Sequence, residues 1–287
     1  MNNTSFQLVT LKFTLTDSTS GYALFRRTLP KFLQLAAADS SLLTEQPDGS
    51  LIISFPRVLG SRLPEIKRFA IYDAMSAFLL GVPPLAEYGY DCECDSERHG
   101  FEWAYGIPVT LLQIISQVNS WRAGSRVTLD DWKTLEMHVL TWKLPCVMLE
   151  QASTPENVNV ARAAVQEGWR HVLLIYVYMG VCGVSSHDSR AQTSVDRIFQ
   201  LGEIVGSSHI GVHMLAHCVA AGLAARLEKH RIAVYEKLVS FRNTRNWIFS
   251  GSQFSEILYH LWHGNGAGGA AVTWDDYIRS RRAVVSI

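Results

Sequence analysis

From residue 61 onward, apolar side chains recur at spacings of three and four residues, the period of a helix with one buried face. Ser61 and Pro64–Glu65 carry the signals of a helix start, and Gly81–Val82–Pro83 carries those of a helix end. The period continues almost to the last residue, so we predict a succession of helices. The apolar positions that define their faces are Ile66, Phe69, Ala70 and Phe78; Trp132, Leu135, Val139 and Trp142; Val195, Ile198, Gly202 and Val205; Leu215, Val219, Leu223 and Leu227; Ile232, Tyr235 and Leu238; and Phe254, Ile257, Leu258 and Leu261.

Capping residues set the remaining helix boundaries. Hydroxyl and carboxylate side chains stabilise the positive end of a helix, and proline is tolerated in its first turn because its missing N–H would have no partner there. These signals predict helices from Pro108 to Val118, from Thr128–Asp131 to Pro145, from Thr154–Pro155 to Gly180 and from Thr273 to Val285. The apolar run from Val172 to Val184 is shorter than the ~18 to 20 residues of a membrane-spanning helix, so we interpret it as a buried helix.

The first 58 residues follow a different pattern. Val9 to Leu15 alternate apolar and polar side chains, the period of a half-buried strand, and Leu51 to Phe55 is a second strand-like run. Between them, Tyr22 to Ala38 is predicted as a short helix that Pro30 interrupts. We therefore predict an all-α fold for residues 59–287, an array of about nine helices in antiparallel hairpins. Residues 1–58 are expected to be a short, partly ordered N-terminal arm or linker with one or two strands.

The amino-acid composition argues against some classes of function. Apolar residues make up 48% of the 287 residues and charged residues 18%, which excludes disorder for most of the chain. Basic and acidic residues are equal in number, 26 each, so there is no basic excess to attract a phosphate backbone, and we expect no direct DNA binding by the domain as a whole. Eight tryptophans and ten tyrosines could give a pocket between helices apolar walls with polar tips.

Five cysteines, an odd number, are scattered along the chain, and a polar stretch rather than an apolar signal sequence follows the first methionine. We therefore expect free thiols in a reducing compartment. The cysteines are Cys92, Cys94, Cys146, Cys182 and Cys218.

Two groups of residues have the types that bind metal. His209, His213 and His217 are four apart, but the outer pair would sit ~12 Å apart on a helix, too far to share one zinc ion. We favour a packing or solvent-exposed role for them. Cys92 and Cys94 lie among acidic residues and His99, but a second cysteine pair is missing, so we interpret this segment as a solvated acidic loop.

Three further patterns resemble functional motifs without their context. Ser186, His187 and Asp188 are adjacent in sequence, whereas the members of a catalytic triad converge from separate segments, so we expect a helix cap at Asp188 or Ser189. Gly264, Gly266 and Gly269 match G-x-G-x-x-G, but a helix rather than a strand precedes them, which favours a helix connection. We assign the arginines at 279, 281 and 282 to the helix dipole rather than to a localisation signal.

Several stretches resemble the regulatory region of fungal-specific transcription factors of the binuclear zinc-cluster class. They are IYDAMSAFLLGVPPLAEYGYD (71–91), GIPVTLLQIISQVNSWR (106–122), EGWRHVLLIYVYMGVCGVSSHDSRAQTSVDRIFQLGEIV (167–205) and ILYHLWHGNGAGGAAVTWDDYIRSR (257–281). The resemblance covers about residues 60–287 and rests on hydrophobic and aromatic patterns. It implies a nuclear, helical regulatory domain that normally follows a DNA-binding module in which six cysteines hold two zinc ions.

This chain departs from that pattern because it contains no Cys-x2-Cys pair, so none of the family's metal-binding or DNA-contacting residues can be assigned to it. We expect no catalytic, cofactor, metal or DNA-binding residues and no membrane association. The predicted partners are transcription machinery or regulatory proteins, with a small-molecule effector and a homodimer left open, and DNA is reached only indirectly or through a missing N-terminal module. Two alternatives remain: a helical interaction scaffold without a role in transcription, and a helical metal-dependent enzyme that uses His209 and His213 or the segment from Cys92 to His99.

Overall fold

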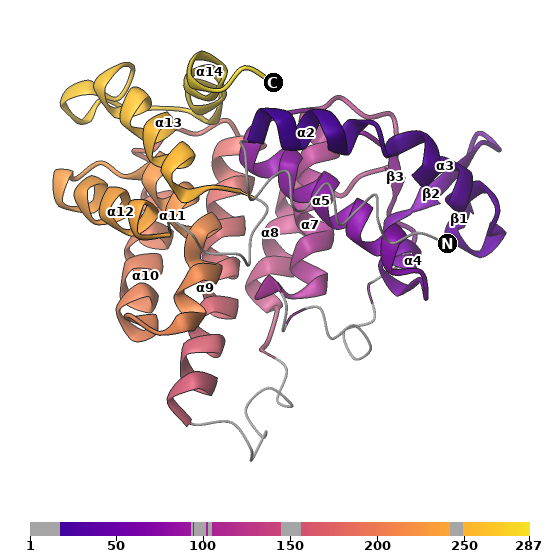
Figure 1. Cartoon of the computed structure of the whole chain (residues 1–287), viewed down its shortest axis with the longest axis horizontal. Helices are drawn as coiled ribbons and strands as arrows, with labels where there is room; N and C mark the ends of the chain where they lie inside the picture. Colours follow the sequence, from indigo (N-terminus) through magenta and orange to yellow (C-terminus); the bar gives the residue numbers. More distant parts are fainter. Residues whose placement is uncertain (1–17, 93, 95–101, 103–104, 145–155, 242–248) are drawn as a thin grey trace.

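Helices make up most of the computed structural model, as the sequence predicts (Figure 1). It describes residues 18–287 except 93, 95–101, 103–104, 145–155 and 242–248. The helices are α2 (Ser18–Arg26), α3 (Leu29–Ala37), α4 (Phe55–Gly60), α5 (Pro64–Leu80), α7 (Val109–Arg122), α8 (Trp132–Thr141), α9 (Glu156–Gly180), α10 (Ser189–Val205), α11 (Leu215–Ala224), α12 (Glu228–Ser240), α13 (Gly251–His263) and α14 (Trp274–Val284), with short 3-10 helices η1 (Ser40–Leu42), η3 (His209–Met214) and η4 (Ala267–Gly269). The all-α prediction is confirmed.

Three predicted helix ends are confirmed by the capping contacts that form there. Thr273 and Asp276 form a reciprocal capping box at the start of α14. Asp131 accepts a hydrogen bond from the Thr134 N–H and caps α8. Gly81 ends α5 in the left-handed conformation, with φ 60° and ψ 36°.

Other boundaries differ from the prediction. Leu63 rather than Ser61 occupies the N-cap position of α5, and the Ser61 hydroxyl instead accepts a hydrogen bond from the Leu63 N–H. The helix α8 ends at Thr141, before Pro145, which lies outside the described residues. The predicted helix start at Thr154–Pro155 also lies outside them, although α9 follows directly.

Ile232, Tyr235 and Leu238 mark a predicted helix, and α12 forms there, but of the three only Leu238 lies on its buried face. Ile232 and Tyr235 are 51% and 42% exposed, and the buried face consists of Arg231, Val234 and Leu238. Arg231 lies inside because its guanidinium donates hydrogen bonds to backbone carbonyls of the two neighbouring helix connections. Leu227 likewise does not extend the face of α11, because α11 ends at Ala224.

A small sheet lies beside the N-terminal helices. Its strands are β1 (Leu43–Glu45), β2 (Leu51–Ser54) and β3 (Tyr88–Gly89); β2 pairs antiparallel with β1 and parallel with β3. The predicted strand at Leu51–Phe55 is confirmed, except that Phe55 begins α4. The strand predicted at Val9–Leu15 lies outside the described residues.

One hydrophobic core contains residues both from the N-terminal arm and from the helices that follow it. The long helix α9 packs against α7, α8, α10 and α11, and α5 packs against α7 (Figure 1). From the N-terminal part, Phe25 and Phe32 enter the same core, where the Phe32 ring stacks on Phe69 with centroids 4.0 Å apart. In the described part of the chain, none of the helices has the length and hydropathy needed to cross a membrane.

Candidate functional site

The three histidines do not form a stripe on one helix, because η3 replaces the first part of the predicted helix. His209 is exposed, whereas His213 and His217 are buried beside α9. The Nε2 atom of His217 lies 2.9 Å from the Val165 carbonyl oxygen. Burial lowers the pKa of both His213 and His217 to about 4, so both rings are neutral at physiological pH. His213 and His217 are therefore packing residues.

The cysteine segment is only partly described. Asp91 is engaged in an ion pair with Arg57 at 2.6 Å, and the Cys94 side chain is buried rather than solvated. Gln113 bridges the segment by accepting a hydrogen bond from the Cys94 N–H and donating one to the Cys92 carbonyl. His99 and the neighbouring acidic residues lie outside the described residues. Among the described residues, no three His, Cys, Asp or Glu side chains are grouped as a metal ion would require, and the four described cysteines are free thiols.

The remaining sequence motifs have structural roles. Asp188 caps α10 by accepting a hydrogen bond from the Arg190 N–H, as predicted. Ser186 and His187 bond instead to the connection between α13 and α14, through Val272 and Gly269 respectively. The glycine motif belongs to that connection and follows α13, so no strand precedes it.

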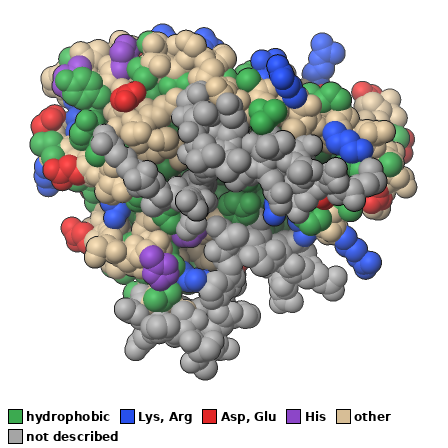
Figure 2. All heavy atoms as spheres, in the orientation of Figure 1, with side chains coloured by type: hydrophobic (Ala, Val, Ile, Leu, Met, Phe, Trp, Pro, Cys, Tyr) green, Lys and Arg blue, Asp and Glu red, His purple; other side chains and the backbone are tan. Residues whose placement is uncertain are grey.

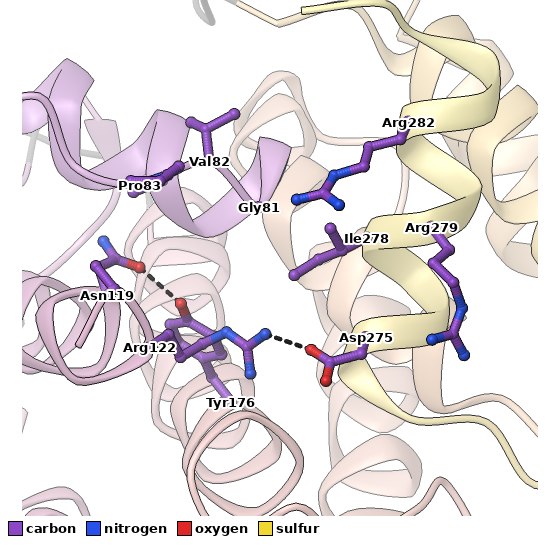
Figure 3. Close-up of a pocket in the computed structure, with 12 residues that line it drawn as sticks. Gly81, Val82, Pro83, Asn119, Arg122, Tyr176, Asp275, Ile278, Arg279 and Arg282 are labelled. Carbon is purple, nitrogen blue, oxygen red and sulfur yellow. Dashed lines mark hydrogen bonds and ion pairs between the residues drawn. The ribbon is translucent and has the colours of Figure 1, made fainter.

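The arginines of α14 lead to a pocket that the sequence motifs did not indicate. We call it the arginine pocket (Figure 3). Its volume is about 430 Å³, within the roughly 300 to 1,000 Å³ of typical ligand sites. It lies between α5, α7, α9 and α14, and its lining residues are Ala77, Gly81, Val82, Pro83, Asn119, Arg122, Ala123, Tyr176, Asp275, Ile278, Arg279 and Arg282.

Asn119 fixes the three helices that form one side of this pocket. Its side-chain N–H donates to the Ala74 carbonyl on α5 at 2.9 Å, and its side-chain oxygen accepts from the Tyr176 hydroxyl on α9 at 2.6 Å. Both Asn119 and Tyr176 are buried, so these bonds replace water that neither side chain can reach. The polar side of the pocket is therefore held in place before any ligand binds.

Arg122 connects this side of the pocket to α14. Its guanidinium donates to the Gly180 carbonyl at 2.8 Å and to the Asp275 carboxylate at 2.6 Å (Figure 3). The Gly180 carbonyl belongs to the last turn of α9, where carbonyl groups lack helical partners. Arg122 thus satisfies a helix end and also forms an ion pair across the pocket.

The position of α14 depends on close contact with the end of α5. A Cβ atom on Gly81 would lie 2.6 Å from the Ile278 Cγ1 atom, so glycine is needed there both for its positive φ and for space. The Tyr277 hydroxyl donates to the Leu79 carbonyl at 2.5 Å, and the Trp274 ring packs on Tyr176 with centroids 4.4 Å apart. These contacts define the width of the pocket.

The charges around the pocket differ in how fully they are paired. Arg279 pairs with Asp276 one turn earlier on α14. Partial burial alone would raise the pKa of Asp276, but hydrogen bonds from Thr273, Asn265 and Arg279 outweigh it and lower that pKa to about 2. Arg282 is exposed, points into the pocket, and has no side-chain partner within the described part of the chain (Figure 3).

The arrangement offers groups that can bind a ligand. Its lining combines aliphatic side chains with three guanidinium groups, which donate hydrogen bonds, and with the Asp275 carboxylate, which pairs with Arg122. A ligand with an apolar body and hydrogen-bond acceptors would match these walls. Of the aromatic residues that composition suggested for a pocket, Tyr176 is in the lining and the tryptophans are not.

Sequence reasoning missed Asn119, Arg122 and Asp275, and it interpreted Arg282 only as a dipole-stabilising residue. A weak signal was present, because asparagine is unfavourable inside a helix, although α7 also buries Gln113, Ser116, Gln117 and Ser120. No local pattern could have paired Arg122 with Asp275, which are 153 positions apart.

Comparison with known proteins gives one clear match. Residues 66–287 match the family model of the fungal specific transcription factor domain. The matched region begins in α5 and includes every helix that lines the arginine pocket. No curated protein and no solved structure matches the chain significantly. Because the family model covers well over half of the sequence, this chain belongs to the fungal specific transcription factor domain family.

Proposed function

We propose that this chain acts in the nucleus as the helical regulatory domain of a fungal transcription factor, and that the arginine pocket binds its small-molecule effector. Family membership supports the role in transcription regulation and a non-enzymatic protein. One observation supports the effector site: the pocket lies between α5 and α14, the first and last helices of the matched region, and the Arg122–Asp275 ion pair joins α7 to α14 across it. A ligand there would contact both ends of the domain and could change how they pack.

Contact with DNA is proposed to be indirect. The chain contains no Cys-x2-Cys pair for a zinc cluster, and its basic and acidic residues balance. Under this proposal a separate zinc-cluster module reads the DNA, and residues 59–287 transmit the effector signal to other regulatory proteins. In an electrophoretic mobility shift assay, the chain alone should give no zinc-dependent, sequence-specific complex, and such a complex would contradict this part of the proposal.

A reporter assay tests the effector site. The chain is fused to a heterologous DNA-binding domain, and reporter output is compared for the wild type, Ala123→Trp and Ala233→Trp. Ala123 lines the rim of the pocket and is exposed, so tryptophan there can fill the pocket without entering the core. Ala233 is exposed on α12 and serves as the matched control.

We expect Ala123→Trp to change reporter output at equal protein level, while Ala233→Trp leaves it at the wild-type value. Equal output from all three fusions would exclude the pocket as the effector site. A wild-type fusion that enters the nucleus but never alters the reporter would favour an interaction scaffold without a role in transcription.

A further inference from the structure

A second hollow lies on the other side of the Val82–Pro83 segment, and we call it the α2 groove. Its volume is about 760 Å³. The residues from Tyr22 to Leu29 form one side, and the segment from Val82 to Leu85 forms the other, with Ile287 at one end. The groove therefore lies where α2, the end of α5 and the last residue of the chain meet.

The walls of the groove are supported from inside the protein. Tyr22 is 5% exposed and belongs to the hydrophobic core. Opposite it, the buried Asp73 carboxylate accepts hydrogen bonds from the backbone N–H groups of Leu85 and Ala86 at 2.7 and 3.2 Å. Because both walls are anchored, the groove exists without a ligand and needs little ordering when one binds.

The charged side chains of the groove are basic. Arg26 and Arg27 line it and both are exposed, while the carboxylate among the described lining residues is the α-carboxylate of Ile287. For neither arginine does the described part of the chain supply an ion pair or a side-chain hydrogen bond. Lys and Arg side chains also gather along the upper edge of the molecule, over α2 and α14 (Figure 2). Arg26 suits the end of α2 through the helix dipole, but Arg27 lies beyond the helix and gains less from it.

From this geometry we propose that the α2 groove binds an acidic peptide segment of a partner protein, with carboxylates on Arg26 and Arg27 and apolar side chains against Tyr22, Pro83 and Ile287. A peptide that mixes acidic and apolar residues matches a groove in which guanidinium groups without a partner among the described residues lie beside an apolar floor. Nucleic acid is a poorer match, because the chain as a whole has no basic excess to hold a phosphate backbone. The α2 groove shares Val82 and Pro83 with the arginine pocket, but this proposal stands whether or not the arginine pocket binds a ligand.

Fluorescence anisotropy of a labelled peptide tests the proposal with the full chain. The probe is a short peptide in which aspartate and glutamate alternate with leucine and phenylalanine. In the control peptide, asparagine and glutamine replace the acids. The groove variant is Arg26→Glu/Arg27→Glu. The matched variant is Arg226→Glu/Lys229→Glu, which makes the same charge change at exposed positions on and after the connection between α11 and α12.

We expect saturable binding of the acidic peptide, no binding of the amide peptide, and affinity about tenfold weaker in the groove variant than in the matched variant. Equal weakening in both variants would reveal non-specific attraction and overturn the proposal, as would unchanged binding in the groove variant. A milder pair, Arg26→Gln/Arg27→Gln, should also weaken binding, and its unfolding temperature shows whether the fold is intact. Tighter, groove-dependent binding of duplex DNA or of phosphatidylserine vesicles would make the groove a phosphate site and contradict a peptide site.

Discussion

The histidines beside α9 and the arginines beside α14 show two opposite uses of basic side chains. His213 and His217 are buried and lose their charge, since burial lowers the pKa of each to about 4. Arg122 and Arg282 line a hollow open to water, where their guanidinium groups can meet a ligand. A basic side chain that lines a solvent-filled hollow is therefore a candidate for ligand binding. A basic side chain that is buried among other residues contributes to packing instead. It also predicts that changes at the histidines affect stability more than changes at the arginines.

The largest effect on the unfolding free energy should come from lowering the pH. Because the pKa of His217 is lowered from 6.5 to about 4, the folded protein binds fewer protons than the unfolded chain between these values. The stabilising contribution is complete above pH 6.5 and is lost as the pH falls through about 4. We expect it to reach about 3 kcal/mol for this one side chain.

The variant His217→Gln isolates that contribution, because glutamine can donate to the Val165 carbonyl and does not titrate. Urea unfolding at pH 7 and pH 4 should show a smaller loss of unfolding free energy in the variant than in the wild type. His171 and His213 have pKa values lowered in the same way, so the wild-type loss exceeds this share. Identical losses in the two proteins would mean that His217 is not buried in the folded state.

The next effect concerns the packing of His217 on α9. A Cβ atom on Gly168 would lie 2.5 Å from the His217 Cδ2 atom, whereas a Cβ atom on Gly202 of α10 would meet nothing within 4 Å. We expect Gly168→Ala to lower the unfolding free energy by about 2 kcal/mol. Gly202→Ala should raise it by about 0.5 to 1 kcal/mol through helix propensity. A stabilising Gly168→Ala would show that the ring does not press on α9.

A smaller effect is expected at the arginine pocket. Arg122→Met removes the hydrogen bond to the Gly180 carbonyl and the ion pair with Asp275, at a cost of about 1 to 2 kcal/mol. Arg190→Met is the matched control, since the Arg190 side chain is 41% exposed against 20% for Arg122 and its ion pair with Asp188 lies within the start of one helix, so the pair should contribute less than about 0.5 kcal/mol. Thermal unfolding of both variants checks the difference, and equal losses would argue against a structural role for Arg122.

The smallest change in stability should be at Arg282. Because its guanidinium has no partner among the described residues, Arg282→Gln is expected to alter the unfolding free energy by less than about 0.5 kcal/mol. The same variant should change the response of the reporter fusion described above. A large loss of stability with an unchanged reporter would reverse the contrast between the two regions.

Much of the fold could be predicted because helix signals are local. Period, caps and prolines located α5 and α14 within a few residues of their observed ends. The error at Ile232 and Tyr235 arose because they share helical spacing with the buried Leu238, yet they lie on a side of α12 that the protein leaves exposed. Only the neighbouring connections make Arg231 a buried residue, and no sequence period reports them.

The candidate sites were beyond local prediction for the same physical reason. The arginine pocket unites positions from Ala77 to Arg282, and the α2 groove unites Tyr22 with Ile287. Each residue taken alone has an ordinary explanation, such as a helix end for Gly81 or a dipole for Arg282. Whether these residues form a site depends on the distances between helices. Core packing determines those distances, and the sequence pattern does not predict them.

Val82 and Pro83 border both hollows and belong to no helix. Any molecule that displaces this stretch from one side alters the room on the other, so the two occupancies would be energetically coupled. Such coupling is reciprocal: the factor by which a metabolite changes the affinity for a protein is the factor by which that protein changes the affinity for the metabolite. With Asp73 holding Leu85 and Ala86, the displacement would be confined to the few backbone atoms between helix end and anchor.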